Sequence, residues 1–168
     1  MSNSRGIGLK VALLGPICFA VFAAGCGPDL EFPPEPRIEY RTFVQSGAAA
    51  KLTIYFTDGD GDIGLDPSDT QWPYDTASEY YHNFFLTFEE LQDGIWVRPE
   101  LELENNYRIP RITPAGQNKT LQGEIAVDLF WPIRPGSPYD TVRFEVMIVD
   151  RALNESNRVF TDPIVVVD

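Results

Sequence analysis

Apolar and polar side chains alternate along much of the chain, which predicts β-strands with one buried face. The alternation is strongest over residues 141–149. The predicted strands cover residues 38–42, 51–57, 81–91, 95–103, 121–130, 141–149 and 158–167. The side chains expected to face a common core are Leu52, Ile54, Phe56, Phe84, Leu86, Phe88, Ile125, Val127, Leu129, Val142, Phe144, Val146 and Ile148.

Glycine and proline separate these segments. Asp93-Gly94 predicts a hairpin turn, and Pro99 places the middle of the fourth segment at an edge or bulge. Gly123 marks a further position for a bulge. No segment shows a convincing helical period, and residues 107–113 are broken by proline. We therefore predict an all-β fold, an antiparallel sandwich of seven to eight strands over residues 37–168.

A run of alternating carboxylates follows the second predicted strand. Asp58, Asp60 and Asp62 are separated by glycines, which is the ligand spacing of many calcium loops. Asp66 and Asp69 follow and are expected to complete the coordination shell. The flanks are predicted as strand and loop rather than helices, so this is not an EF-hand. We expect calcium rather than magnesium, because side-chain oxygens are many; the alternative is a plain Asp-Gly turn.

A second polar loop follows the strongest predicted strand. The segment Asp150-Arg151-Ala152-Leu153-Asn154-Glu155-Ser156 resembles the ending of bacterial immunoglobulin-like and fibronectin type III-like domains, with Leu153 in place of a glycine. In that fold the loop after the second strand and the loop before the last strand lie at the same end. The resemblance thus implies an immunoglobulin-like sandwich in which Asp150 and Asn154 face Asp58–Asp62. From this placement we hypothesise one calcium site shared by both loops. The alternative is that Asp150 and Asn154 only cap their own turn.

The N-terminus has the layout of an export signal. Arg5 and Lys10 precede an apolar run over residues 11–24 that ends in Ala23-Ala24-Gly25-Cys26. This ending resembles the lipobox of bacterial lipoproteins, which implies a signal peptide over residues 1–25 and a Cys26 that carries acyl chains such as palmitate. Residues 26–36 then form a proline-rich tether. The alternative is an ordinary signal peptide cut near Ala24, or an uncleaved anchor.

Composition excludes several classes of function. The net charge is −12, which argues against nucleic-acid binding. The two cysteines are Cys18 and Cys26, so residues 37–168 hold no disulfide and no thiolate metal site. The single histidine, His82, excludes a multi-histidine site.

Together the lipobox, the tether and the two acidic loops resemble a group of small outer-membrane lipoproteins of Bacteroidota. The resemblance implies a lipid-anchored protein of the outer membrane, on either its periplasmic or its cell-surface face. Asp75-Thr76-Ala77 also resembles the short O-glycosylation signal of those bacteria, which makes Thr76 a candidate acceptor.

No pairing of a nucleophile with a base is visible, so we predict a protein that is not an enzyme. The leading hypothesis is a calcium-stabilised interaction or accessory subunit of an outer-membrane assembly or secretion complex. A first alternative is a carbohydrate-binding surface lipoprotein that stacks sugars on aromatic side chains near the acidic loop. A second is a hydrolase built on paired carboxylates. The aromatic residues of the first alternative are Trp72, Tyr74, Tyr80 and Tyr81.

Overall fold

The computed structural model describes residues 31–101, 105–112 and 119–167. The predicted signal peptide and Cys26 lie outside these residues. The strands are β1 (Arg37–Ser46), β2 (Ala49–Asp58), β3 (Phe84–Gln92), β4 (Ile95–Val97), β5 (Leu121–Phe130), β6 (Thr141–Ile148), β7 (Val159–Phe160) and β8 (Ile164–Val165), and a short 3₁₀ helix, η1, covers Glu79–Tyr81.

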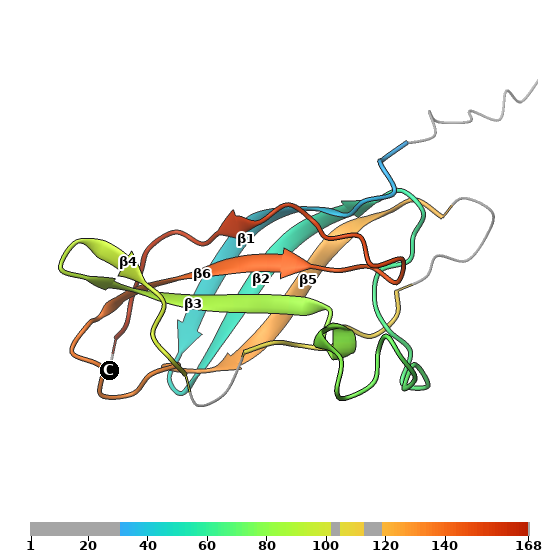
Figure 1. The fold of residues 1–168 in the computed structure, drawn as a ribbon. Coiled ribbons are helices and arrows are strands. Elements are labelled where there is room, and N and C mark those ends of the chain that lie inside the picture. Colours follow the sequence, from blue (N-terminus) through green and yellow to red (C-terminus); the bar gives the residue numbers. More distant parts are fainter. Residues whose placement is uncertain (1–30, 102–104, 113–118, 168) are drawn as a thin grey trace, which may run out of the picture.

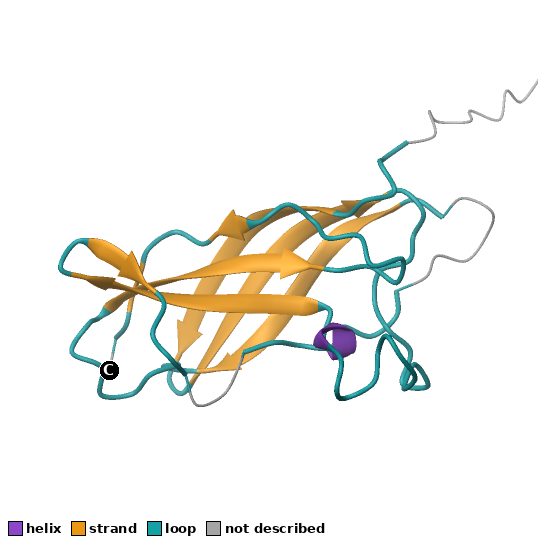
Figure 2. Ribbon diagram, viewed as in Figure 1, coloured by secondary structure: helices purple, strands orange, loops and turns teal. Residues whose placement is uncertain are grey.

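The strands form two antiparallel sheets that face each other (Figures 1 and 2). One sheet has the order β1-β2-β5, and the other has the order β4-β3-β6-β7, with β8 also paired to β6. The sheet of β1, β2 and β5 thus faces the sheet that contains β3, β6 and β7, as in immunoglobulin-like sandwiches. The predicted all-β, antiparallel sandwich is confirmed.

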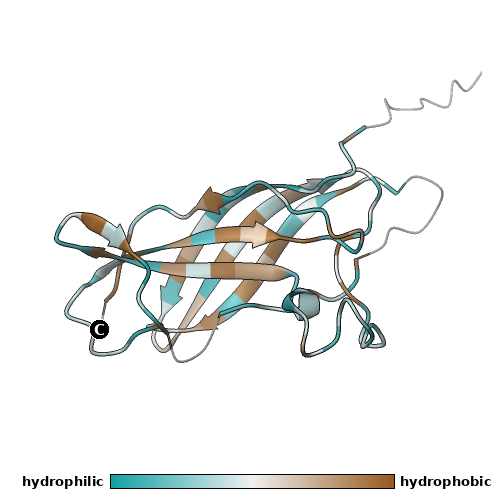
Figure 3. Cartoon of the chain, in the orientation of Figure 1, coloured by the Kyte–Doolittle hydropathy of each residue, from teal (hydrophilic) through white to brown (hydrophobic). Residues whose placement is uncertain are grey.

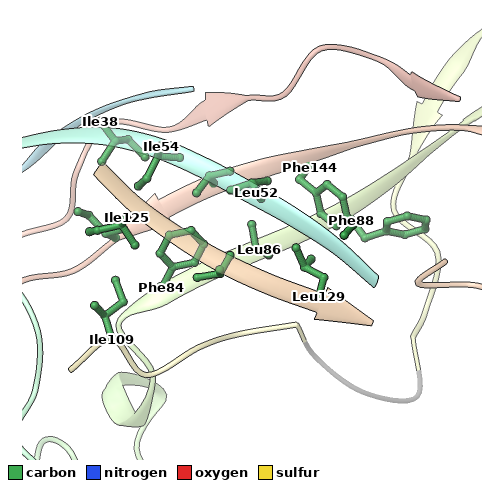
Figure 4. Close-up of a cluster of buried hydrophobic side chains, with 14 of the residues drawn as sticks. Ile38, Leu52, Ile54, Phe84, Leu86, Phe88, Ile109, Ile125, Leu129 and Phe144 are labelled. Atoms are coloured by element: carbon green, nitrogen blue, oxygen red, sulfur yellow. The ribbon is translucent and has the colours of Figure 1, made fainter. Parts of the chain in front are cut away.

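The core lies between the sheets and is built from alternate residues of the long strands. Figure 3 shows hydrophobic and hydrophilic positions alternating along the three-stranded sheet, and Figure 4 shows the buried side chains meeting between the layers. Phe84 of β3 and Phe144 of β6 are fully buried on the inner face of the second sheet, and they pack in one cluster with Leu52 and Ile54 of β2. Every side chain predicted to face the core is buried.

Three predicted elements differ from the structure. The fourth strand ends at Val97, because Pro99 follows and cannot donate to a ladder. The last strand is split into β7 and β8 around Pro163. Gly123 makes no bulge, since β2 and β5 pair without a register shift and the Phe56 ring packs over Gly123; the irregularity lies in β1, between Tyr40 and Thr42.

The topology places the two acidic loops at one end of the sandwich. β2 and β6 both finish there, and the described N-terminal segment enters β1 at the same end, away from the C-terminus (Figure 1). Two segments that are about 90 residues apart in sequence therefore become neighbours in space.

Candidate metal centre

Four aspartates from the two loops gather at this end. Asp58, Asp60 and Asp62 come from the loop after β2, and Asp150 follows β6. Each offers one carboxylate oxygen, and these four oxygens lie within 4.8 Å of one another. Asp58 and Asp150 are buried, Asp62 is half-buried and Asp60 is exposed, so the cluster opens to solvent on the side of Asp60.

The cluster contains buried oxygens without hydrogen-bond partners. Asp58 Oδ2 accepts from the Asp62 amide at 2.9 Å. Asp58 Oδ1 and Asp62 Oδ1 are buried, and neither has a hydrogen-bond partner in the described part of the chain. Leaving a buried charged oxygen unpaired costs more than leaving a neutral group unpaired. A cation between the carboxylates would satisfy both oxygens at once.

Asp150 is held in place by Asn154. The Asn154 backbone amide donates to Asp150 Oδ1 at 2.8 Å, and its side-chain amide donates to Asp150 Oδ2 at 2.8 Å. Leu153 adopts a positive φ of 66°, the backbone conformation that the glycine of the resembling motif would favour. The turn is therefore capped, and Asp150 also faces the other three aspartates. Asn154 orients Asp150 through its side-chain NH₂ group.

Hydrogen bonds to backbone carbonyls join the two loops. The Arg151 amide donates to the Asp62 carbonyl at 3.3 Å, and the Tyr74 hydroxyl donates to the Arg151 carbonyl. No sequence pattern indicates these roles of Tyr74 and Arg151, because they depend on the path of the long loop between β2 and β3.

Asp66 and Asp69, which are predicted to complete the coordination shell, lie outside the cluster. Asp69 Oδ2 accepts from the Asp66 amide at 2.7 Å, and the Asp69 carbonyl accepts from Arg108 at 2.6 Å. The Asp66 carboxylate lies 3.5 Å from the Arg111 guanidinium. Asp66 therefore holds the long loop to its neighbours through its carboxylate, and Asp69 does so through its backbone carbonyl. Thr76 is exposed in a turn of the same loop.

Burial and mutual repulsion make the cluster unfavourable as a set of free anions. Burial is the main cause that raises the pKa of Asp58 to about 6; the hydrogen bond from Asp62 lowers it, and the neighbouring carboxylates raise it. Burial also leads in raising the pKa of Asp62 to about 6, followed by the charges of Asp150 and Asp60. The pKa of Asp150 is raised as well, chiefly by burial, against the hydrogen bonds from Asn154.

These shifts predict the pH dependence of the metal-free protein. A carboxyl group with a raised folded-state pKa stabilises the fold below its unfolded pKa of 3.8, and this contribution is lost as pH rises through about 6. We therefore expect the free energy of unfolding in EDTA to fall between about pH 4 and about pH 7. Urea unfolding in EDTA at several pH values measures this. The Asp58→Asn variant should show a shallower fall, and an identical slope in both proteins would contradict the assignment.

Comparison with protein-family models, with curated proteins and with solved structures finds no match for this chain. Among the described residues, no helix is long and apolar enough to cross a membrane. The resemblance to Bacteroidota lipoproteins therefore stays a prediction.

Proposed function

We propose that the protein is a lipid-anchored, calcium-stabilised β-sandwich that acts as a non-catalytic accessory subunit of an outer-membrane complex. The observation that supports calcium binding is the convergence of four aspartates, two of which have a buried oxygen without a hydrogen-bond partner in the described part of the chain. The four are Asp58, Asp60, Asp62 and Asp150. The anchor at Cys26 and the outer-membrane location rest on the sequence motifs.

The number of carboxylates in the cluster favours calcium over magnesium. Oxygens on opposite sides of Ca²⁺ lie about 4.6–5.2 Å apart, and around Mg²⁺ they lie about 4.0–4.2 Å apart. The four carboxylate oxygens all lie within 4.8 Å of one another, which leaves room for either ion, but magnesium usually takes only one or two carboxylates. They supply four of the six to eight oxygens that calcium takes, and water on the exposed side near Asp60 would complete the shell.

An interaction role is supported by how the cation would act on the loops. It would join the loop after β2 to the loop after β6, and so fix the surface that this end of the sandwich presents. A fixed surface binds a partner with less loss of conformational entropy than a mobile one. The acidic composition suits a partner that is neither nucleic acid nor an anionic membrane surface.

Calcium is expected to raise the melting temperature of the protein. At a calcium concentration about 100-fold above the dissociation constant, binding adds about 2.7 kcal/mol to stability, which corresponds to roughly 10 °C for a domain of this size. Thermal unfolding in EDTA, in calcium and in magnesium measures the shift, and magnesium should give a smaller one.

The matched variants are Asp58→Asn and Asp66→Asn, which remove the same charge from one loop. Asp58→Asn should abolish the shift in melting temperature that calcium causes. In EDTA at neutral pH the variant should be at least as stable as the wild type, because the substitution removes a buried anion. Asp66→Asn should keep the shift, because Asp66 lies outside the cluster. An equal calcium shift in all three proteins, or none in the wild type, would refute the site.

The two alternative functions fare differently against the geometry. Trp72 is 82% exposed, which favours a stacking role in sugar binding, whereas Tyr74, Tyr80 and Tyr81 are half-buried and do not form an exposed row with it. A glycan that binds the wild type and not a Trp72→Ala variant would support that alternative. The second alternative, a hydrolase built on paired carboxylates, stays a prediction, because the 4.8 Å limit applies to single oxygens and not to the separation of whole carboxyl groups.

A further inference from the structure

The segment that precedes β1 is docked on the acidic loop. The Gly59 amide donates a hydrogen bond of 2.9 Å to the Pro33 carbonyl. The approach is so close that a Cβ at Gly59 would lie 2.2 Å from the Phe32 carbonyl oxygen and 2.6 Å from that of Pro33. Glycine is thus the residue that allows the two backbones to touch.

Gly59 stands between two of the clustered aspartates. Asp58 precedes it and Asp60 follows it, and on its other side the Gly59 carbonyl accepts from the Thr120 hydroxyl at 3.4 Å. The position of the Gly59 amide therefore depends on where Asp58 and Asp60 place their carboxylates. A cation that pulls both carboxylates inward fixes this amide, whereas repulsion between free carboxylates displaces it.

The next firm attachment of the N-terminal segment lies closer to β1. Pro36 is buried, and Ile38 exchanges two hydrogen bonds with the Asn157 side chain, at 2.9 Å and 3.0 Å. Pro33 itself is exposed, so its contact with Gly59 is separable from the fold of the sandwich. Release of Pro33 would free the chain back to Pro36 without breaking the β1–β2 ladder.

We propose that cation binding at Asp58, Asp60, Asp62 and Asp150 docks the N-terminal segment at Phe32–Pro33, and that loss of the cation releases it. This inference rests on the cation site proposed above. From Cys26, a chain of this length can reach at most about 25 Å to a point of attachment at Pro33, and at most about 35 Å to one at Pro36. Calcium would therefore set how far, and in which orientation, the domain stands from an anchor at Cys26.

Linkage makes the effect reciprocal. If the cation favours docking of the segment, docking strengthens cation binding by the same factor. A coupling of typical size changes each equilibrium by about tenfold. Weakening the Gly59–Pro33 contact should thus lower calcium affinity by about that factor and leave the four carboxylates in place.

Limited proteolysis of the full chain tests the inference. A glutamate-specific protease cleaves the Glu31–Phe32 bond, which flanks the docked residues, and cleavage after the exposed Glu100 reports the protease activity itself. We expect cleavage after Glu31 to be about tenfold slower in calcium than in EDTA. The rate of cleavage after Glu31, divided by the rate after Glu100, should fall by the same factor. Calcium binding is measured on the same protein by calorimetry.

Two variants sharpen the test. Gly59→Ala pushes the segment away, so cleavage after Glu31 should be fast with or without calcium, and calcium should bind about tenfold more weakly. Asp60→Asn removes a carboxylate without touching Phe32 or Pro33, so it should make cleavage insensitive to calcium levels that saturate the wild type. Should Gly59→Ala fail to fold, the Asp60→Asn result decides.

The two proposals fail differently. If calcium binds to the wild type and the rate of cleavage after Glu31 does not change, the coupling is refuted and the calcium site stands. If calorimetry detects no calcium binding, the proposed site itself is refuted, and the coupling falls with it.

Discussion

Replacing Phe144 by alanine should destabilise the domain by about 3–5 kcal/mol, the usual cost of removing a buried phenylalanine. Phe144 is fully buried at the centre of β6, and its ring lies 5.7 Å from the Phe43 and Phe88 rings and 6.4 Å from the Trp131 ring. These side chains come from both sheets and from the chain after β5, so they cannot close the cavity together. Urea unfolding, followed by tryptophan fluorescence, measures the loss.

Phe130 is the matched control for this prediction. It is also a phenylalanine on a long strand, but it is 92% exposed at the end of β5. Phe130→Ala should change the free energy of unfolding by no more than about 0.5 kcal/mol. Equal losses in the two variants would mean that the core does not lie between the sheets as described.

Gly64→Ala should cost about 3 kcal/mol or more and also weaken calcium binding, because it combines backbone strain with a steric clash. Gly64 has a positive φ of 87°, and an added Cβ would lie 2.1 Å from the Pro110 carbonyl oxygen. Backbone hydrogen bonds fix this approach, from Leu65 to Ile109 at 2.9 Å and from Arg111 to Leu65 at 3.0 Å. The acidic loop must move when these bonds break, so calcium affinity should fall with stability.

Gly47→Ala separates strain from clash. Gly47 also has a positive φ, of 58°, but an added Cβ there would meet no atom within 4 Å. Its cost should be about 1 kcal/mol, with calcium affinity unchanged, since Gly47 lies in the turn before β2. Denaturant unfolding and calorimetry on both variants measure the two effects. If Gly47→Ala were as costly as Gly64→Ala, the contact with Pro110 would not be the cause.

The cluster of four aspartates illustrates how local sequence and long-range structure contribute. Three of the four clustered aspartates could be identified from the sequence, because alternate carboxylates after a strand point to a common centre when the chain turns tightly. Asp150 could be placed beside them only by assuming the topology of the sandwich. Asp66 was included for its position in the sequence, and the structure instead turns it toward Arg111.

The outer face of the second sheet was not predicted at all. Glu89 and Glu145 point away from the core and are nevertheless buried, under arginines that come from three different segments. Arg143 also stacks against the rings of Trp96 and Phe160, at 4.3 Å and 4.2 Å. Single-sequence alternation assigns such residues to solvent, since it records only which face of a strand they occupy.

The long strands, their buried faces and the position of the acidic loop after β2 could be predicted from the sequence. Those features follow from the alternation of side chains along a strand and from the needs of a tight turn, which are local properties of the chain. The tertiary structure alone decided which carboxylates meet, that Asn154 orients Asp150, and that Pro33 rests on Gly59. These contacts join residues from distant segments, and their geometry depends on how the two sheets pack and how the long loop crosses the end of the sandwich.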